Sequence, residues 1–268
     1  MSDVIIENRN AALWVTFNRP EVFNSLSPEA LCTILDMWER AANDDSVKAV
    51  VLTGAGDRAF CSGADLKLTI PLLSGARKPE TAFDHKVLNT PDIITRLMQR
   101  NRTFCKPIIA AINGTAMAGG CEMVLASDIR IASSNATLAL SEPKVGVVPG
   151  GGSMVRLPRQ VSWCQAMEFL LTGDTISADK AREIGLINRV VAPEDLYAEV
   201  DKLVATLTQN APLALQAIKR TAIQTSGLDL DEAFAIEDSE TGKILASEDA
   251  REGPRAFAEK RQPAFQGK

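Results

Sequence analysis

Two short glycine-containing segments hold the residues whose types and spacing best fit catalysis. They are Phe60-Cys61-Ser62-Gly63-Ala64-Asp65-Leu66 and Asn113-Gly114-Thr115-Ala116-Met117-Ala118-Gly119-Gly120-Cys121-Glu122. Each follows an apolar run and leads into a helical pattern, so each can aim a backbone N–H at one point from a helix N-terminus, where the dipole favours negative charge. Two such amides facing each other would form an oxyanion hole without a catalytic Ser, Cys or metal, which indicates chemistry on a thioester enolate.

Either segment alone would be interpreted as a tight turn. Their occurrence together, with a carboxylate three residues after Gly119, favours the functional interpretation. A glycine at that position also lets a carbonyl group approach the backbone with no Cβ in the way.

Two glutamates form the second candidate set. Glu122 lies in the first turn of an otherwise apolar helical pattern, so it is either a solvated first-turn acid or a buried functional one. The apolar neighbours favour burial, which raises a carboxylate pKa unless the group is partnered. Glu142 is expected to end a strand just before Pro143, and its alternative role is an exposed acid or an ion-pair partner of Lys144.

Composition limits the possible classes of protein. The chain has 268 residues, 46% of them hydrophobic, and a net charge of −5, which argues against nucleic acid as the main partner. It has no run of about 18 apolar residues, so no membrane span is expected, and its first residues lack the pattern of a signal peptide. The five cysteines are odd in number and lack metal-type spacing, which favours reduced thiols in the cytoplasm.

Alternating strand and helix patterns predict an α/β protein. A hairpin is expected first, over residues 4–7 and 12–17 with a turn at 8–10, followed by a helix that starts after Ser27-Pro28 and runs to about Ala42. The later expected strands are 48–53, 107–112, 128–132, 137–140 and 186–191, and the later expected helices include 119–126, one after the 147–152 segment and one capped by Ser177.

The strand signal disappears after Pro193. Four helices are expected there, over residues 194–209, 212–224, 230–247 and 249–260. We therefore predict a core over residues 1–195 and a C-terminal helical region over 196–268 whose apolar faces are buried against the core or another subunit. Residues 69–89 contain Pro71, Gly75 and Pro79 and are expected to form a long functional or partly disordered loop.

These motifs resemble the crotonase (enoyl-CoA hydratase/isomerase) superfamily over nearly the whole chain. The specific part is Ser62-Gly63-Ala64-Asp65-Leu66 with Ala118-Gly119-Gly120-Cys121-Glu122, supported by Ser141-Glu142-Pro143-Lys144-Val145-Gly146 and Pro149-Gly150-Gly151-Gly152. The resemblance implies a spiral core of repeated ββα units, a C-terminal helical trimerisation region, and a homo-oligomer that is a trimer or a dimer of trimers.

The resemblance also assigns roles to residues. The amides of Ala64 and Gly119 would bind the thioester oxygen, and glutamates at both matching positions, Glu122 and Glu142, mark hydratases. One carboxylate orients and deprotonates water, and the other exchanges the α-carbon proton. Coenzyme A, as part of the substrate and with no separate cofactor or metal, would be bound by Arg19, Val22, Ala64, Asp65, Leu66, Phe257 and Lys260, the last two often contributed by a neighbouring subunit. A solvated helix charge is the alternative for Lys260.

Other reactive or glycine-rich positions receive less weight. His85 is the only histidine, so no His-based triad is expected, and it is predicted to lie at the surface. Cys121 has no activating base nearby in the sequence, and Trp163 is expected to be packing. The glycines at 150–152 lack the Lys and Ser/Thr of a P-loop and are interpreted as a close helix–loop contact near the acyl pocket.

Three functions remain open at this point. The first is reversible hydration of a 2-enoyl-CoA. The second is another reaction of the same superfamily, either double-bond isomerisation or dehydration of a substituted acyl-CoA. The third is a non-catalytic or RNA-binding member, which would need a basic helix face, whereas residues 28–42 hold only Arg40 among several acids.

Overall fold

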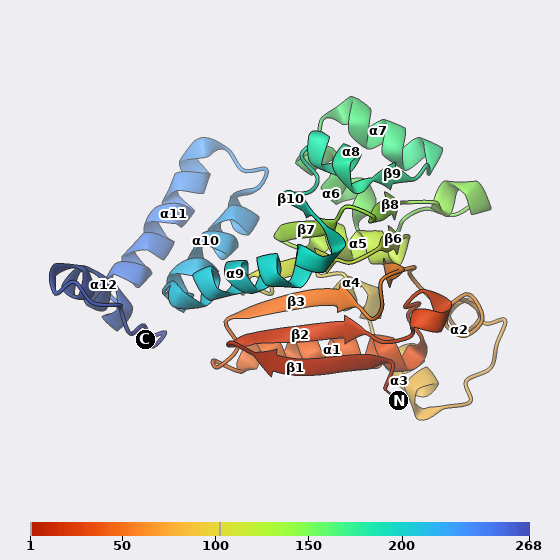
Figure 1. Ribbon diagram of the computed structural model, residues 1–268, viewed down its shortest axis with the longest axis horizontal. Helices are drawn as coiled ribbons and strands as arrows, with labels where there is room; N and C mark the ends of the chain where they lie inside the picture. Colours follow the sequence, from red (N-terminus) through yellow and green to blue (C-terminus); the bar gives the residue numbers. More distant parts are fainter. Residues whose placement is uncertain (1, 102) are drawn as a thin grey trace.

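The computed structural model describes residues 2–101 and 103–268, and two β-sheets form its centre (Figure 1). The larger sheet holds, in spatial order, β1 (Val4–Arg9), β2 (Ala12–Phe17), β3 (Ala49–Gly54), β5 (Ile108–Ile112), β7 (Ile129–Ser133) and β10 (Arg189–Val191). The smaller sheet holds β4 (Ala59–Cys61), β6 (Thr115–Met117), β8 (Thr137–Ala139) and β9 (Ile176–Ser177).

From β3 to β8, consecutive strands alternate between the two sheets. β3 belongs to the larger sheet and β4 to the smaller one, and the pairs β5–β6 and β7–β8 repeat this arrangement. Each pair is followed by helices: α2 (Thr69–Leu73), α3 (Ala82–Asn89) and α4 (Ile93–Leu97), then α5 (Gly119–Ala126), then α6 (Ser153–Gln160) and α7 (Trp163–Thr172). Strand pairing is parallel except between β1 and β2 and between β8 and β9. The predicted spiral of ββα units is confirmed.

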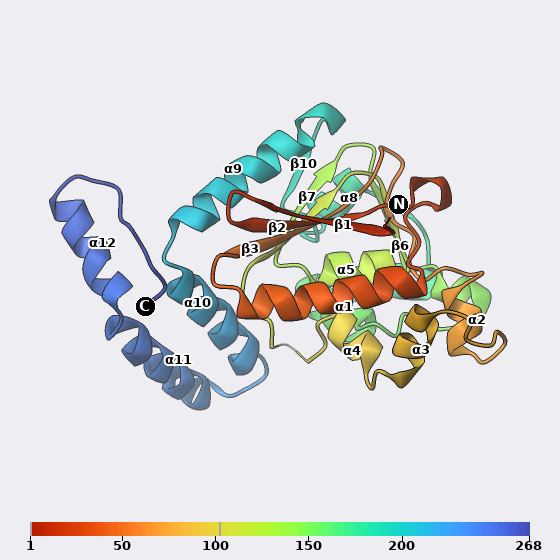
Figure 2. The same cartoon turned by 90° about the horizontal axis from the view of Figure 1, so that it is seen from below.

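Helices cover both faces of the larger sheet, as Figure 2 shows. On one face lies α1 (Pro28–Asn43), which begins as predicted because the Ser27 hydroxyl accepts a hydrogen bond from the Ala30 amide. Its side chains Leu31, Leu35 and Trp38 are buried in the main core. On the other face lies α9 (Leu196–Gln209), which buries Leu196, Val200 and Val204 against the sheet.

The segment expected to be a long loop, residues 69–89, is largely helical, so that prediction was wrong. It contains α2 and α3, and the N-terminus of α3 is closed by a capping box between Thr81 and Asp84. Arg77 also donates to both carboxylate oxygens of Asp84, at 2.7 and 2.9 Å. These contacts order a stretch whose proline and glycine content hides its helices from a periodicity analysis.

The first hairpin is confirmed with a shifted turn. The strands extend to Arg9 and from Ala12, so the chain reverses at Asn10 and Ala11, whose φ angles are 55° and 59°. That conformation matches the tight turn that the right-handed twist of paired strands favours.

The expected C-terminal helices are present. After α8 (Ala178–Glu183) and α9 come α10 (Pro212–Thr225), α11 (Leu230–Leu245) and α12 (Glu248–Ala258). Figure 1 shows α10 to α12 extending to one side of the sheets, while α9 lies along them. The division at 195/196 remains a prediction, with α9 as the helix that joins the C-terminal region to the core. Within the described residues, no helix is both long and apolar enough to cross a membrane.

Candidate active site

The turn between β6 and α5 presents the first of the two predicted amides. Ala118 adopts φ 49°, ψ −126°, an unusual conformation for a residue with a Cβ, and its own N–H donates to the Ala139 carbonyl at 2.9 Å. Gly119 is then the first residue of α5, where an N–H has no acceptor within the helix. Backbone strain of this kind, about 1–3 kcal/mol, often marks a functional site.

The second predicted amide lies against the first. Leu26 donates to the Gly63 carbonyl at 2.8 Å and accepts from the Asp65 amide at 3.0 Å, so the Ala64 N–H between them points away from Leu26. A Cβ built on Gly119 would lie 3.4 Å from the Gly63 Cα and 3.8 Å from the Ala64 nitrogen. The fold therefore brings Ala64 and Gly119 together, although they are far apart in the sequence.

This close approach depends on glycines. Gly63 has φ +90°, and a Cβ on it would lie 2.9 Å from the Gly119 nitrogen. A Cβ on Gly120 would lie 2.0 Å from the Cys61 carbonyl oxygen. Any side chain at either position would push the two segments apart, because real Cβ atoms do not come so close to backbone atoms.

Glu122 is buried near the N-terminus of α5, with its side chain directed at the N-terminus of α6. Its Oε1 accepts hydrogen bonds from the Ser153 hydroxyl at 3.1 Å and the Ser153 amide at 3.3 Å. Burial raises the pKa of Glu122, while the Ser153 and Gly151 hydrogen bonds and the charge of Arg156 oppose that rise without cancelling it. The expectation of a solvated first-turn acid is excluded.

Glu142 does not end a strand, so this part of the sequence interpretation was wrong. β8 ends at Ala139, and Glu142 opens a short 3-10 helix over Glu142–Val145, where Pro143 at the second position fits the first turn of a helix. Its Oε2 is buried with no hydrogen-bond partner among the described residues, and Lys144 pairs instead with Asp174 at 2.6 Å.

The charge of Glu122 acts on the Glu142 carboxyl group. Burial raises the pKa of Glu142, and the nearby charge of Glu122 raises it further. Glu122 has hydrogen-bond donors for its charged form, whereas Glu142 has a buried oxygen that a water or substrate donor would satisfy. Such a pair suits general acid–base chemistry, because one group is favoured as the ionised base and the other as the protonated acid.

The neighbouring thiol takes no part in this pair. Cys121 is completely buried and burial raises its pKa strongly, so it stays protonated and is a poor nucleophile. This agrees with the sequence interpretation, as does the exposed position of His85 on α3.

The residues proposed for CoA binding fall into two groups. Arg19, Val22, Asp65 and Leu66 lie beside Ala64, since the 19–26 segment bonds to the 62–65 segment. Arg19 donates to Asp65 at 2.7 Å and to the Ser25 carbonyl at 2.9 Å, so its charge stabilises the loop, while Val22 and Leu66 are exposed. Burial acts to raise the pKa of Asp65, but hydrogen bonds from Arg19 and two backbone amides lower it overall.

The second group is distant within this protomer. Phe257 and Lys260 lie at the end of α12, and both views place α12 at the opposite end of the molecule from α2, which follows the Ala64 loop (Figures 1 and 2). Phe257 is 87% exposed. These two residues do not meet the rest of the proposed CoA site in a single chain.

Sequence reasoning missed three residues around Glu122: Met98, Ser153 and Arg156. A Cβ on Gly151 would lie 2.4 Å from Glu122 Oε2 and 3.0 Å from Met98 Cγ, so these groups converge on the glycine loop. Only the hydroxyl type and helix-start position of Ser153 could have drawn attention to it. Trp163 was wrongly expected to be packing, because its side chain is 69% exposed on α7.

With this geometry established, comparison with known proteins identifies the class. The family model described as enoyl-CoA hydratase/isomerase matches residues 7–268. The chain therefore belongs to the enoyl-CoA hydratase/isomerase family, and the crotonase resemblance is confirmed.

Individual relatives match along nearly their whole lengths. The chain is 40% identical to enoyl-CoA hydratase EchA19 of Mycobacterium tuberculosis, covering 99% of this chain and 97% of the relative. It is 38% identical to (E)-benzylidenesuccinyl-CoA hydratase of Thauera aromatica, covering 98% and 99%. The crystal structure of enoyl-CoA hydratase from Bacillus anthracis superposes with a TM-score of 0.89 at 32% identity, covering 99% of this chain and 100% of that one.

Proposed function

We propose that the protein is an acyl-CoA hydro-lyase that reversibly adds water to a 2-enoyl-CoA. The observation that carries the proposal is that the fold brings the Ala64 and Gly119 backbones together and places two carboxylates near each other: Glu122, which is buried, and Glu142, whose Oε2 is buried and whose pKa the charge of Glu122 raises. Donors aimed at the thioester oxygen stabilise the enolate, and two carboxylates handle the two protons that hydration moves.

In this proposal the thioester oxygen accepts hydrogen bonds from the Ala64 and Gly119 amides. Glu122, supported by the Ser153 donors, takes a proton from water as the water oxygen bonds to the β-carbon. The electron pair of the double bond moves toward the thioester carbonyl, and Glu142 delivers its proton to the α-carbon. Proton exchange with solvent restores both carboxyl groups, and dehydration is the reverse sequence.

The alternative within the family is double-bond isomerisation or dehydration of a substituted acyl-CoA, which would use the same enolate. The retention of both carboxylates favours hydration, since moving a double bond needs only one group that transfers a proton. A non-catalytic or RNA-binding role is disfavoured by the buried carboxylate pair, which a binding protein has no reason to keep desolvated.

The direct test is a substrate screen. Purified protein is mixed with 2-enoyl-CoA thioesters of varied length and branching, and loss of the conjugated enone absorbance is followed. Rapid loss with at least one thioester supports the proposal. Conversion of a 3-enoyl-CoA into a 2-enoyl-CoA, with no hydration of any 2-enoyl thioester, would replace it with isomerase activity.

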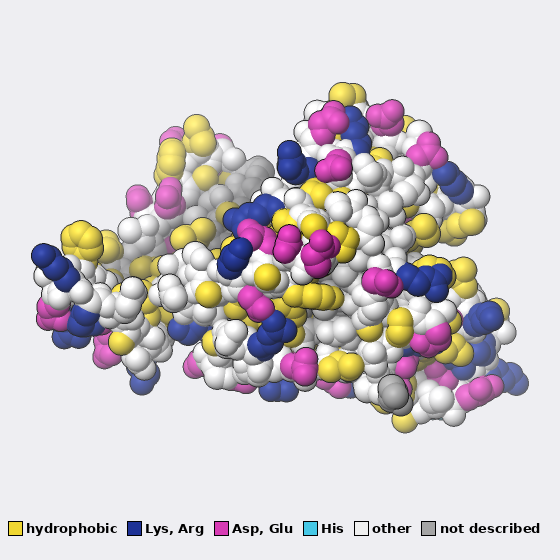
Figure 3. Space-filling view, viewed as in Figure 1, with side chains coloured by type: hydrophobic (Ala, Val, Ile, Leu, Met, Phe, Trp, Pro, Cys, Tyr) yellow, Lys and Arg dark blue, Asp and Glu magenta, His cyan; other side chains and the backbone are white. Residues whose placement is uncertain are grey.

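We also propose a homo-oligomer, a trimer or dimer of trimers, without a separate cofactor. The exposed hydrophobic side chains of α11 and α12, Leu230, Phe234, Leu245 and Phe257, support this assembly, and Figure 3 shows hydrophobic surface on that part of the molecule. Assembly would also let Phe257 and Lys260 reach the CoA site of a neighbouring subunit. A cytoplasmic location fits the buried free thiols of Cys61 and Cys121.

The assembly is tested by truncation. Light scattering should report a trimer or hexamer for the intact chain, and removal of the residues after Gly227 should give monomeric or insoluble protein because α11 and α12 are lost. Phe234→Glu, which places a charge in the proposed contact without removing a helix, should weaken assembly in the same direction. A stable, active monomer of the intact chain would contradict the proposal.

The proposed contact between Lys260 and the CoA nucleotide is tested by comparing two substrates, one with the nucleotide and one without it. Lys260→Ala should raise KM for an enoyl-CoA about tenfold, the usual order for a lost charged hydrogen bond to phosphate. It should leave the rate with the matching enoyl-pantetheine, which lacks the nucleotide, unchanged. Equal effects on both substrates would show that Lys260 does not contact the nucleotide.

A further inference from the structure

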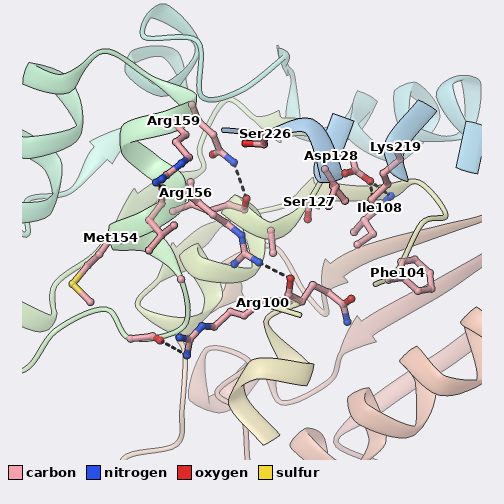
Figure 4. A pocket seen from close by; sticks show the side chains of 18 residues that line it. Arg100, Phe104, Ile108, Ser127, Asp128, Met154, Arg156, Arg159, Lys219 and Ser226 are labelled. Atoms are coloured by element: carbon pink, nitrogen blue, oxygen red, sulfur yellow. Dashed lines mark hydrogen bonds and ion pairs between the residues drawn. The ribbon is translucent and has the colours of Figure 1, made fainter. Parts of the chain in front are cut away.

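A cavity of about 550 Å³ lies behind the glycine loop of the site, between α6 and α10 (Figure 4). Its lining includes Gly150, Gly152 and three arginines, Arg100, Arg156 and Arg159. Figure 4 shows Arg100 and Arg156 on the same side of the cavity, with dashed lines to backbone carbonyls. Neither Glu122 nor Glu142 lines it, so the glycine loop separates this cavity from the carboxylate pair.

Arg156 links the glycine loop to the chain segment that follows α4. Its Nη2 donates to the carbonyls of Met98 at 2.6 Å and Gln99 at 2.9 Å, at the end of α4. Its Nη1 donates to the Gly151 carbonyl at 3.3 Å, and a Cβ on Gly152 would lie 2.6 Å from that same nitrogen. The guanidinium therefore contacts the glycine loop through one nitrogen and the end of α4 through the other, a forked arrangement that a lysine ammonium cannot reproduce.

The opposite side of the same loop faces Glu122. A Cβ on Gly151 would lie 2.4 Å from Glu122 Oε2, and two residues later Ser153 donates its amide and hydroxyl to Oε1. A shift of the loop toward the cavity would withdraw both donors from the carboxylate. The loop has no side chains at residues 150–152 to hold it, so its position depends on contacts such as those of Arg156.

We propose that Arg156 is a positioning residue for Glu122: it fastens the glycine loop so that the Ser153 donors stay on the carboxylate, and it places a positive charge on that side of the site. The inference rests on the proposed function, in which Glu122 acts as the ionised base. Arg156 itself is separated from the reacting atoms by the loop.

Several charged or titratable groups face Glu122 from the surrounding elements. They are Glu142 from the 3-10 helix, Arg156 from α6, and the adjacent Cys121 thiol, which burial keeps protonated. Arg100 lies nearby and donates to the Gly150 carbonyl at 3.2 Å. Burial raises the pKa of both carboxyl groups and the charge of Glu122 raises that of Glu142 further, whereas the charge of Arg156 lowers the pKa of Glu122.

The test compares Arg156→Gln, Arg156→Lys and a matched control, Arg159→Gln, by the pH dependence of kcat/KM. Arg159 is on the same helix and in the same cavity, but its guanidinium donates to the Val155 carbonyl of its own helix rather than to the glycine loop. Removal of the positive charge raises the pKa of Glu122, so the acidic limb of the Arg156→Gln profile should move to higher pH. Its loss of kcat/KM should be roughly threefold to tenfold larger at about pH 6 than at about pH 9.

Arg156→Lys keeps the charge and loses the planar contacts. Its acidic limb should stay near that of the wild type, while kcat falls about tenfold with little change in KM, because the loop and the Ser153 donors are less well held. Arg159→Gln should match the wild type in both respects. Melting curves accompany each profile.

Three outcomes would overturn the inference. The first is wild-type profiles for both Arg156 variants. The second is a loss in Arg156→Gln that is equal at all pH values. The third is a wild-type kcat in Arg156→Lys. This result would refute the positioning role of Arg156 even if Arg156→Gln does not fold. Glu122→Gln is measured in parallel: if it keeps its rate the assigned base is wrong, whereas an inactive Glu122→Gln beside normal Arg156 variants refutes only the role of Arg156.

Discussion

Glu122→Gln and Glu142→Gln are each expected to lower kcat by about a hundredfold or more, the scale of general acid–base contributions. Glutamine has nearly the same shape as glutamate but cannot exchange a proton. In the Glu122→Gln variant the Ser153 donors can still bond to the side-chain amide oxygen, so the pocket should keep its geometry and KM should change little. Steady-state kinetics on the best enoyl-CoA thioester measures both quantities.

The control for this experiment is Glu168→Gln, because Glu168 is an exposed glutamate on α7 outside the site. It should keep the wild-type rate. A near wild-type rate in either site variant would show that the residue is not the proton-transfer group assigned to it. Because burial raises both pKa values, and the charge of Glu122 raises that of Glu142 further, the wild-type kcat/KM should also decline on the acidic side as Glu122 becomes protonated.

Substitutions at Gly119 are expected to have the second large effect. A Cβ at this position would make contacts of 3.4 Å with Gly63, 3.5 Å with Met98 and 3.8 Å with the Ala64 nitrogen, which are ordinary packing distances. The same carbon would lie beside both proposed amides, where we propose that the thioester oxygen binds. Gly119→Ala should therefore fold and lose about tenfold in kcat/KM, and Gly119→Val should lose about a hundredfold or more, or roughly 3 kcal/mol.

Melting curves separate this effect from a loss of folding. Gly242→Ala, in α11, serves as the matched control because a Cβ there would meet nothing within 4 Å. It should leave the rate unchanged and the melting temperature equal or higher, since alanine favours helices. A folded Gly119→Val protein with full activity would remove the oxyanion hole from the mechanism.

The strained backbone at this turn does not fall on the glycine. The residue with positive φ at this turn is Ala118, not Gly119. A sequence pattern rich in glycine shows that a tight turn is present, but not which residue carries its strained conformation, because tertiary packing on both sides decides that. The functional need for a small residue at Gly119 is space between the amides rather than backbone conformation.

Elements defined by local interactions could be predicted closely. The helix over Gly119–Ala126 and the start of α1 after Ser27 have the expected bounds, because caps and apolar periodicity act within a few residues. The prediction of a long loop over residues 69–89 was wrong because the helices there depend on the Arg77–Asp84 pair and on packing rather than on a long periodic pattern. The prediction that Glu142 ends a strand was wrong because β8 stops at Ala139, before the end of the apolar run in the sequence.

The candidate site shows the same division. Ala64, Gly119, Glu122 and Glu142 could be proposed because their motifs are local and the family is recognisable, and the fold brings Ala64 beside Gly119 and Glu122 near Glu142. Ser153 and Arg156 act on Glu122 from a different helix, about 30 residues further along the chain. No local sequence motif around either residue predicts that contact. Phe257 and Lys260 were predicted for the CoA site, but a single chain places them at its far end, and only an assembly would bring them there.

Product analysis in labelled water tests the central claim most directly. The wild-type protein is given its best 2-enoyl-CoA in water enriched in ¹⁸O and, separately, in D₂O, and the product is analysed by mass spectrometry and NMR. The expected product is a 3-hydroxyacyl-CoA with ¹⁸O on the β-carbon and one deuterium on the α-carbon, and Glu122→Gln should form no labelled product on the same timescale. A product with a moved double bond and no oxygen from solvent, or hydration that continues without Glu122, would contradict it.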